Sequence, residues 1–299
     1  MNMIELTGIN KIYRTNEIET QALENVNLNV EKGEFLSIMG PSGCGKSTLL
    51  NIMGLLDAPT SGTIRIAGTL VEGMKDKELA AFRNKNLGFV FQSFHLINSL
   101  NVIDNVELPL LYRNVSAKER RHLAEEVLKK VGLSHRMRHM PTQLSGGQCQ
   151  RVAIAQALVC DTQLLMLDEP LANLDLASQR ATVHVLAKLN RELNMTIQVV
   201  AHDLNMLLPI LTGAVYLLDG HPHYADMHKV LDSDLLTHLY GTQVQVVTTP
   251  QGDMFVTPTP DELQDQPQDM HTAAEVAQLH HHEHGNATNG STANSAENR

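Results

Sequence analysis

The glycine-rich stretch at residues 40–48 has the composition of a phosphate-binding loop. It runs Gly40-Pro41-Ser42-Gly43-Cys44-Gly45-Lys46-Ser47-Thr48 and fits the pattern G-x-x-x-x-G-K-[ST]. In this pattern, glycines let backbone N–H groups surround phosphates, the lysine reaches the outer phosphates and the serine hydroxyl binds Mg²⁺. The apolar residues 35–39 predict a strand before the loop, and residues 47–55 predict a helix after it. The phosphates would then lie at the positive end of a helix.

Two adjacent carboxylates, Asp168 and Glu169, follow a second apolar run at residues 164–167. Transfer of a phosphoryl group to water needs positioned charge more than covalent catalysis. Asp168 can therefore hold Mg²⁺ directly or through water, while Glu169 can orient or deprotonate the attacking water. His202 follows another predicted strand, residues 196–201, and should emerge at the same edge of the sheet.

A second candidate anion site begins at Ser145. The sequence Ser145-Gly146-Gly147-Gln148 is predicted to open a helix that ends near residue 159. It would offer a hydroxyl, a flexible backbone and the free N–H groups of a helix start. One chain therefore carries two segments that can bind phosphate.

With these motifs in this order, residues 3–258 resemble the ATP-binding cassette (ABC) family of transport ATPases. The resemblance implies that ATP and Mg²⁺ are the cofactors. It also implies that Tyr13 stacks on adenine and that Gln92 is the Q-loop glutamine, a catalytic residue that also binds Mg²⁺. Asp175 would contact the nucleotide from the D-loop, and His202 would be the switch histidine. For Tyr13, packing within the protein is the alternative, because aromatic residues pack more often than they stack on ligands.

The resemblance also implies an assembly. In the family, the signature segment, which is Ser145-Gly146-Gly147-Gln148 in this chain, closes over ATP held by the phosphate loop of a partner subunit. This chain has one set of motifs, so we expect a homodimer, or a heterodimer with a similar chain, that is closed by ATP. Such an interface would form with ATP and loosen after hydrolysis, and this change between two states can drive work elsewhere in an assembly.

The order of elements predicts an α/β fold, a P-loop NTPase core with an N-terminal antiparallel β region and an inserted helical subdomain. The ATPase domain would span residues 1–258, with the helical subdomain at about 93–160. Within that insert, residues 118–131 carry apolar side chains at helical spacing. In the family, the insert and the segment around Gln92 form the groove that binds the permease.

Two branches of the family are represented. Residues 1–155 resemble ATPases of lipoprotein release and macrolide export, whereas residues 156–258 resemble zinc and manganese import ATPases. Export is favoured because the segment expected to contact the permease lies in the first part, and metal import is the alternative. A non-transport ABC ATPase acting on nucleic acid or a protein scaffold is a third hypothesis. A chain of net charge −10 without a Lys/Arg stripe argues against nucleic-acid binding.

The tail, residues 259–299, has the composition of a disordered segment. It contains no aromatic residue and has seven acidic groups against one arginine. Its histidines can hold Zn²⁺, Ni²⁺ or Cu²⁺ together with Glu283; they are His271, His280, His281, His282 and His284. The alternative is a solvated tail that binds metal only in the test tube.

Membrane association is expected to come through a permease. The longest apolar stretch, residues 206–218, is interrupted by Pro209, Thr212 and Gly213 and is shorter than the roughly 20 residues that cross a bilayer. No N-terminal signal segment is visible, so we expect the chain at the cytoplasmic face of the membrane. The three cysteines lack C-x-x-C spacing and predict no disulfide framework.

Overall fold

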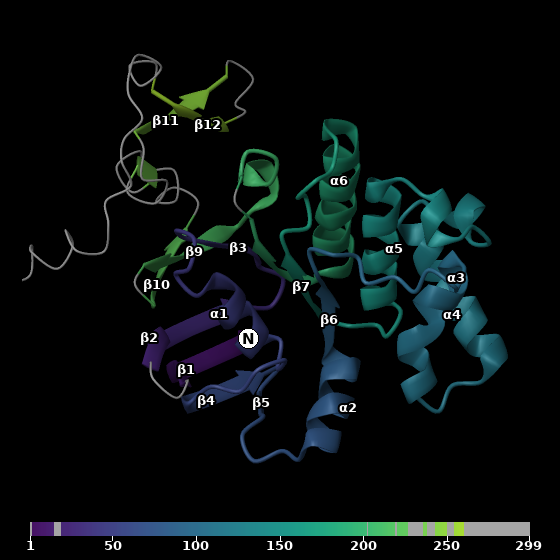
Figure 1. Ribbon diagram of the computed structural model, residues 1–299, viewed down its shortest axis with the longest axis horizontal. Helices are drawn as coiled ribbons and strands as arrows, with labels where there is room; N and C mark the ends of the chain where they lie inside the picture. Colours follow the sequence, from purple (N-terminus) through teal and green to yellow (C-terminus); the bar gives the residue numbers. More distant parts are fainter. Residues whose placement is uncertain are drawn as a thin grey trace, which may run out of the picture. The chain divides into compact units, whose positions relative to one another are not determined.

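A six-stranded sheet forms the centre of the computed structural model, with the strand order β10-β9-β3-β8-β7-β6 (Figure 1). Its strands are β3 (Phe35–Met39), β6 (Leu87–Val90), β7 (Leu164–Asp168), β8 (Thr196–Val200), β9 (Gly213–Leu218) and β10 (His221–Asp226). All neighbours pair in parallel except β9 and β10, which form a hairpin. Strands β3 and β8 are buried throughout, as expected of strands covered on both faces.

The structure describes residues 2–14, 19–201, 203–218, 220–226, 236–237, 243–249 and 254–259. The predicted switch histidine, His202, and the histidine-containing tail after residue 259 lie outside this range. The domain boundary at residue 258 and the metal-binding tail therefore stay predictions.

A second, four-stranded sheet has the order β2-β1-β4-β5 and is antiparallel throughout. It is built from β1 (Asn2–Arg14), β2 (Glu19–Glu31), β4 (Ser61–Ile66) and β5 (Thr69–Leu70). Helix α1 (Lys46–Met53) contacts strands of both sheets. Its apolar residues share one core cluster with Ile4 of β1 and Met166 of β7. The predicted N-terminal antiparallel region is thus confirmed, and α1 is fixed between two sheets.

Helices cover the other face of the central sheet (Figure 1). They are α3 (Val102–Glu107), the 3-10 helix Leu108–Tyr112, α4 (Ala117–Lys130), α5 (Gly146–Leu158) and α6 (Leu176–Leu193), with short 3-10 turns at Ser134–Arg136, Pro141–Gln143 and Leu208–Ile210. The helix predicted at residues 118–131 is observed as α4, with Ala124, Val127 and Leu128 buried. Gln156 of α5 donates from Nε2 to the carbonyl of Asn105 at 2.9 Å and so ties α5 to α3.

Helix α2 (Asp76–Asn86) and the strands β11 (Val244–Thr248) and β12 (Met254–Pro258) have no counterpart in the sequence prediction. Helix α2 has no fully buried residue, and only Leu79 and Phe82 pack against the core, so its helical periodicity is weak. Strands β11 and β12 form a separate two-stranded sheet. Among the described residues, no helix combines the length and the apolar character needed to cross a membrane.

Candidate nucleotide-binding site

The predicted phosphate loop connects β3 directly to α1. Three of its glycines have positive φ: 144° at Gly40, 81° at Gly43 and 98° at Gly45, the residue that precedes α1. Residues other than glycine rarely adopt a positive φ. At Gly40 a side chain would also collide with the backbone carbonyl of Leu217. The loop therefore needs glycine for its backbone shape, and it places the N–H groups of the first turn of α1 at the loop.

Lys46 is 7% exposed, and its ammonium group is bonded to the loop itself. Its Nζ donates to the carbonyl of Gly40 at 2.8 Å and to that of Pro41 at 2.7 Å. These bonds compensate the cost of burying a charge. A phosphate oxygen entering the loop would replace a neutral acceptor with an anionic one, and charge-assisted hydrogen bonds are the stronger kind.

Two of the predicted catalytic residues, Gln92 and Glu169, meet at the carboxyl edge of the central sheet. Gln92 follows β6 and Glu169 follows the neighbouring strand β7, and Gln92 Nε2 donates to Glu169 Oε2 at 3.1 Å. Asp168 ends β7 and is half-buried beside Val200 of β8. Because β8 is the neighbour of β3, this edge continues to the phosphate loop.

Glu169 has a strained backbone. Its φ is 48°, which is uncommon for a residue with a long side chain. Its N–H donates to the carbonyl of Val200 at 2.9 Å, and its own carbonyl accepts from the N–H of Ala172 at 3.1 Å. Such conformations persist only where the surroundings enforce them, and they are frequent at functional sites. No local sequence pattern predicts the positive φ of Glu169.

The signature segment begins α5 with reciprocal hydrogen bonds. Ser145 Oγ accepts from the N–H of Gln148 at 3.3 Å, and Gln148 Oε1 accepts from the N–H of Ser145 at 3.0 Å. This is a capping box, which fixes the helix start. Gly147 is buried against α6: a methyl group at this position would lie 2.5 Å from both Cβ and Oγ of Ser178. The glycine thus permits close approach of two helix ends, a reason that the sequence alone did not supply.

Asp175 caps the start of α6 within its own subunit. Its Oδ1 accepts from the N–H of Ser178 at 2.9 Å, and its Oδ2 accepts from the hydroxyl of the same residue at 2.6 Å. These bonds lower the pKa of the exposed Asp175 carboxyl. Its predicted contact with nucleotide across an interface stays a prediction.

The two predicted phosphate-binding segments lie on different faces of the central sheet. Apolar residues of α1 belong to the core cluster shared with the antiparallel sheet, whereas those of α5 belong to the cluster shared with α3, α4 and α6. Figure 1 shows the two helices on separate sides of the molecule. The helices that carry the signature segment and the phosphate loop of one subunit therefore pack in separate cores.

Tyr13 lies near the end of β1 with its side chain 44% exposed. Its hydroxyl donates to Asp57 Oδ2 at 3.0 Å, and Lys11 Nζ lies 4.8 Å from the ring centroid. Sequence reasoning missed Asp57 and Lys11. The interacting partners are more than 40 residues apart in the sequence, and no local motif connects them.

A groove of about 890 Å³ lies beside β6 and α2. Its apolar lining includes Leu56, Phe89, Phe91 and Tyr112, of which Tyr112 is 87% exposed. Its charged lining residues are all cationic, namely Lys77, Arg83, Lys85 and Arg113. In a chain of net charge −10, an apolar groove lined by cations suits a partner surface that presents apolar and acidic side chains.

Comparison with known proteins identifies relatives over most of the chain. A family model described as ABC transporter matches residues 23–172. The lipoprotein-releasing system ATP-binding protein LolD of Pseudoalteromonas translucida is 44% identical over 218 residues, which cover 73% of this chain and 94% of that protein. The macrolide export ATP-binding/permease protein MacB of Rhodopirellula baltica is 44% identical over 204 residues, which cover 67% of this chain and 30% of that protein.

Solved structures agree with these sequence matches. The post-hydrolysis dimer of the ATP-binding cassette MJ0796 from Methanocaldococcus jannaschii, bound to ADP and Pi, is 43% identical. It superposes with a TM-score of 0.69 and covers 75% of this chain and 99% of that chain.

Proposed function

We propose, from the premise that this chain belongs to the ABC transporter family and is one of its ATP-hydrolysing subunits, that it powers a separate membrane permease of the export or lipoprotein-release type. The ATPase part of this proposal rests on one observation: the phosphate loop, Asp168, Glu169 and Gln92 lie along one edge of the central sheet. The relatives LolD and MacB confirm the predicted resemblance to the export branch and do not favour the importer alternative. The resemblance of residues 156–258 to zinc and manganese importers stays a prediction.

The phosphate groups of ATP would be bound by the N–H groups of residues 40–48 and by Lys46. The donors around them fit Mg²⁺, because a hydroxyl at Ser47, an amide oxygen at Gln92 and a carboxylate at Asp168 are the hard oxygen ligands that this ion prefers. When bound, Mg²⁺ neutralises charge that develops on the β- and γ-phosphate oxygens.

Glu169 would position the attacking water and accept its proton. The amide of Gln92 donates to one carboxylate oxygen and so orients the carboxylate. His202 is proposed to contact the γ-phosphate region from the end of β8. Tyr13 is proposed as the stacking platform for adenine, with a half-exposed ring suited to this role.

ATP would close a dimer. The phosphate loop and the signature segment lie on different faces of one subunit, so a complete site needs the signature segment of a partner. The MJ0796 cassette is dimeric in its ADP-bound structure. We propose a homodimer, or a heterodimer with a similar chain, in which Ser145, Gly146, Gly147 and Gln148 contact the γ-phosphate held by the partner.

The cationic, apolar groove beside β6 is the proposed docking site for the permease. Its lining includes Leu87 and Phe89 of β6 and also Phe91, the residue directly before Gln92, so docking and hydrolysis can influence each other. Docking would hold the chain at the cytoplasmic face of the membrane. Metal binding by the histidine tail is a separate proposal, with no support from the described residues.

The test is capture of the permease by a Glu169→Gln variant held in ATP. This variant should bind ATP, hydrolyse it very slowly and accumulate as a dimer, whereas Lys46→Ala should neither dimerise nor capture a permease in ATP. The co-purifying membrane protein is identified by mass spectrometry. A permease with few spans and a large extracytoplasmic domain supports the proposal, and a compact, many-span permease with intramembrane His and Asp contradicts it. Unchanged turnover in Glu169→Gln would show that another base acts.

A further inference from the structure

A network of polar contacts holds the ring of Tyr13 at the end of β1. The hydroxyl donates to Asp57 Oδ2 at 3.0 Å. The other carboxylate oxygen, Oδ1, accepts from Lys11 Nζ at 2.7 Å and from the N–H of Ala58 at 2.8 Å. The Lys11 ammonium group also donates to the carbonyl of Ala58 at 2.8 Å and lies over one face of the Tyr13 ring. Both the edge and one face of the ring are thereby engaged.

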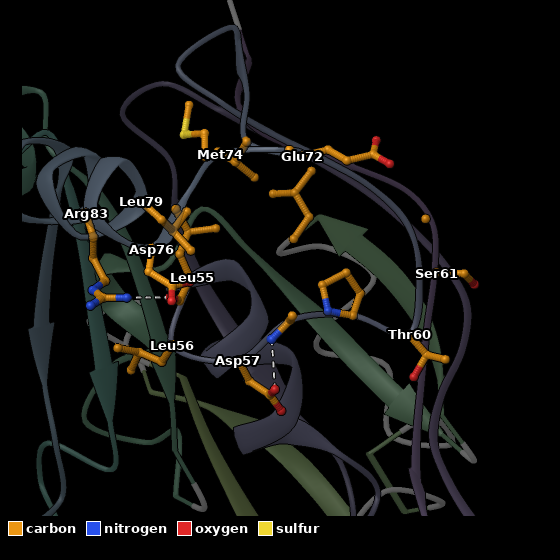
Figure 2. A pocket seen from close by; sticks show the side chains of 16 residues that line it. Leu55, Leu56, Asp57, Thr60, Ser61, Glu72, Met74, Asp76, Leu79 and Arg83 are labelled. Atoms are coloured by element: carbon orange, nitrogen blue, oxygen red, sulfur yellow. Dashed lines mark hydrogen bonds between the residues drawn. The ribbon is translucent and has the colours of Figure 1, made fainter.

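Asp57 is itself fixed to the helix that carries the phosphate loop. Its backbone N–H donates to the carbonyl of Asn51 in α1 at 3.3 Å, and the N–H of Leu56 donates to the same carbonyl at 2.8 Å. On the other side of this turn, Arg83 Nη1 donates to the carbonyl of Leu55 at 2.7 Å. Figure 2 shows this turn along the hollow of about 820 Å³, with Asp57 and Arg83 both bonded to its backbone.

We propose that Asp57, supported by Lys11, is a positioning residue for the nucleotide base: it anchors the ring of Tyr13 at a fixed place relative to α1, so that adenine stacks on the free face while the phosphates lie at the start of the helix. This inference rests on the proposed stacking role of Tyr13. It adds a residue, 44 positions away in the sequence, that makes the two ends of the nucleotide site one rigid unit.

The charge of Asp57 suits this role. Burial alone would raise the pKa of its carboxyl, but the hydrogen bonds from Lys11 and Tyr13 and the charge of Lys11 bring the pKa below its usual value. The carboxylate thus accepts from both partners near neutral pH. Lys11 is well placed to hold it, because its side chain is 12% exposed.

The anchor should strengthen nucleotide binding because it fixes the rotamer of Tyr13 before the ligand arrives. A ring exposed to this degree and without an anchor would sample several rotamers, and binding would then have to immobilise it. Immobilising one such side chain weakens affinity by about two- to tenfold. The effect should fall on ligands that carry a base and spare ligands that consist of phosphate alone.

The experiment compares ADP with pyrophosphate, both with Mg²⁺, by titration calorimetry on the full chain. Tyr13→Phe keeps the ring but removes the hydroxyl, and Asp57→Asn removes the carboxylate. Each should raise the Kd for ADP by about two- to tenfold while the Kd for pyrophosphate stays within error. The double variant should bind ADP no more weakly than the weaker-binding of the two single variants, because both substitutions remove the same interaction. Glu72→Gln, which changes another carboxylate lining the same hollow, is the matched control and should alter neither Kd.

The outcomes separate the inference from the proposal on which it rests. Equal losses for ADP and pyrophosphate in Asp57→Asn, or no loss for ADP in both single variants, overturn the positioning role. Tyr13→Ala tests the stacking itself: if it also leaves the Kd for ADP unchanged, Tyr13 does not bind adenine. If Tyr13→Ala weakens ADP and the two anchor variants do not, stacking stands and only the anchor is refuted.

Discussion

Replacement of Gly147 by alanine should destabilise the contact between the starts of α5 and α6. The added methyl carbon would lie 2.5 Å from Cβ and Oγ of Ser178. A Cβ atom moves only with its backbone, so one helix must shift. Overpacking of this kind costs about 1–3 kcal/mol. The same substitution at Gly146 places the methyl group 3.3 Å from the flexible tip of Leu174, which can rotate away.

Gly146→Ala is therefore the matched control. Both glycines lie in the first turn of α5 and neither has a positive φ, so alanine gains similar helix propensity at each, up to about 1 kcal/mol. That gain cancels in the comparison. The difference in unfolding free energy between the two variants should be about 1–3 kcal/mol. At about 2–4 °C per kcal/mol for a domain of this size, Gly147→Ala should melt measurably below Gly146→Ala.

The assay is thermal unfolding of both variants without nucleotide. Both glycines belong to the proposed γ-phosphate contact, so the melting temperature and not turnover reports the packing effect. The reasoning is refuted if the two alanine variants melt at the same temperature.

Three further outcomes are expected. Gln198→Met should raise the free energy of unfolding by about 1–3 kcal/mol, since the buried amide of Gln198 has no hydrogen-bond partner among the described residues. A melting temperature below that of the unaltered chain would argue against this prediction. Asn105→Leu should lower the free energy of unfolding by about 1–3 kcal/mol, because the Asn105 side chain accepts from the N–H of Ile97 and donates to three carbonyls. Denaturant unfolding that matches the unaltered chain would contradict this prediction. Deletion of residues 260–299 should leave basal ATPase nearly unchanged, and a large loss of turnover would assign the tail a structural or regulatory role.

Short sequence windows determined the parts of this protein that form by local interactions. The phosphate loop was predictable because strand, glycines and helix follow one another in the chain, and the glycines at 40, 43 and 45 adopt the positive φ that such a loop requires. Helix α4 was predictable because its apolar residues recur at helical spacing. The start of α5 was predictable from a serine followed by a glutamine three residues later, a pattern that caps itself. These windows, with the resemblance that they carry, were sufficient to identify an ATP-hydrolysing cassette.

Only the tertiary structure decided which distant residues meet. Gln92 bonds to Glu169 across 77 positions because β6 and β7 are neighbours in the sheet, and Tyr13 bonds to Asp57 across 44 positions because β1 and the turn after α1 lie together. Local sequence does not encode strand order, so neither pair was predictable from motif spacing. The packing of Gly147 on Ser178 and the left-handed backbone of Glu169 arise in the same way, from contacts between elements that the chain brings together only when it folds.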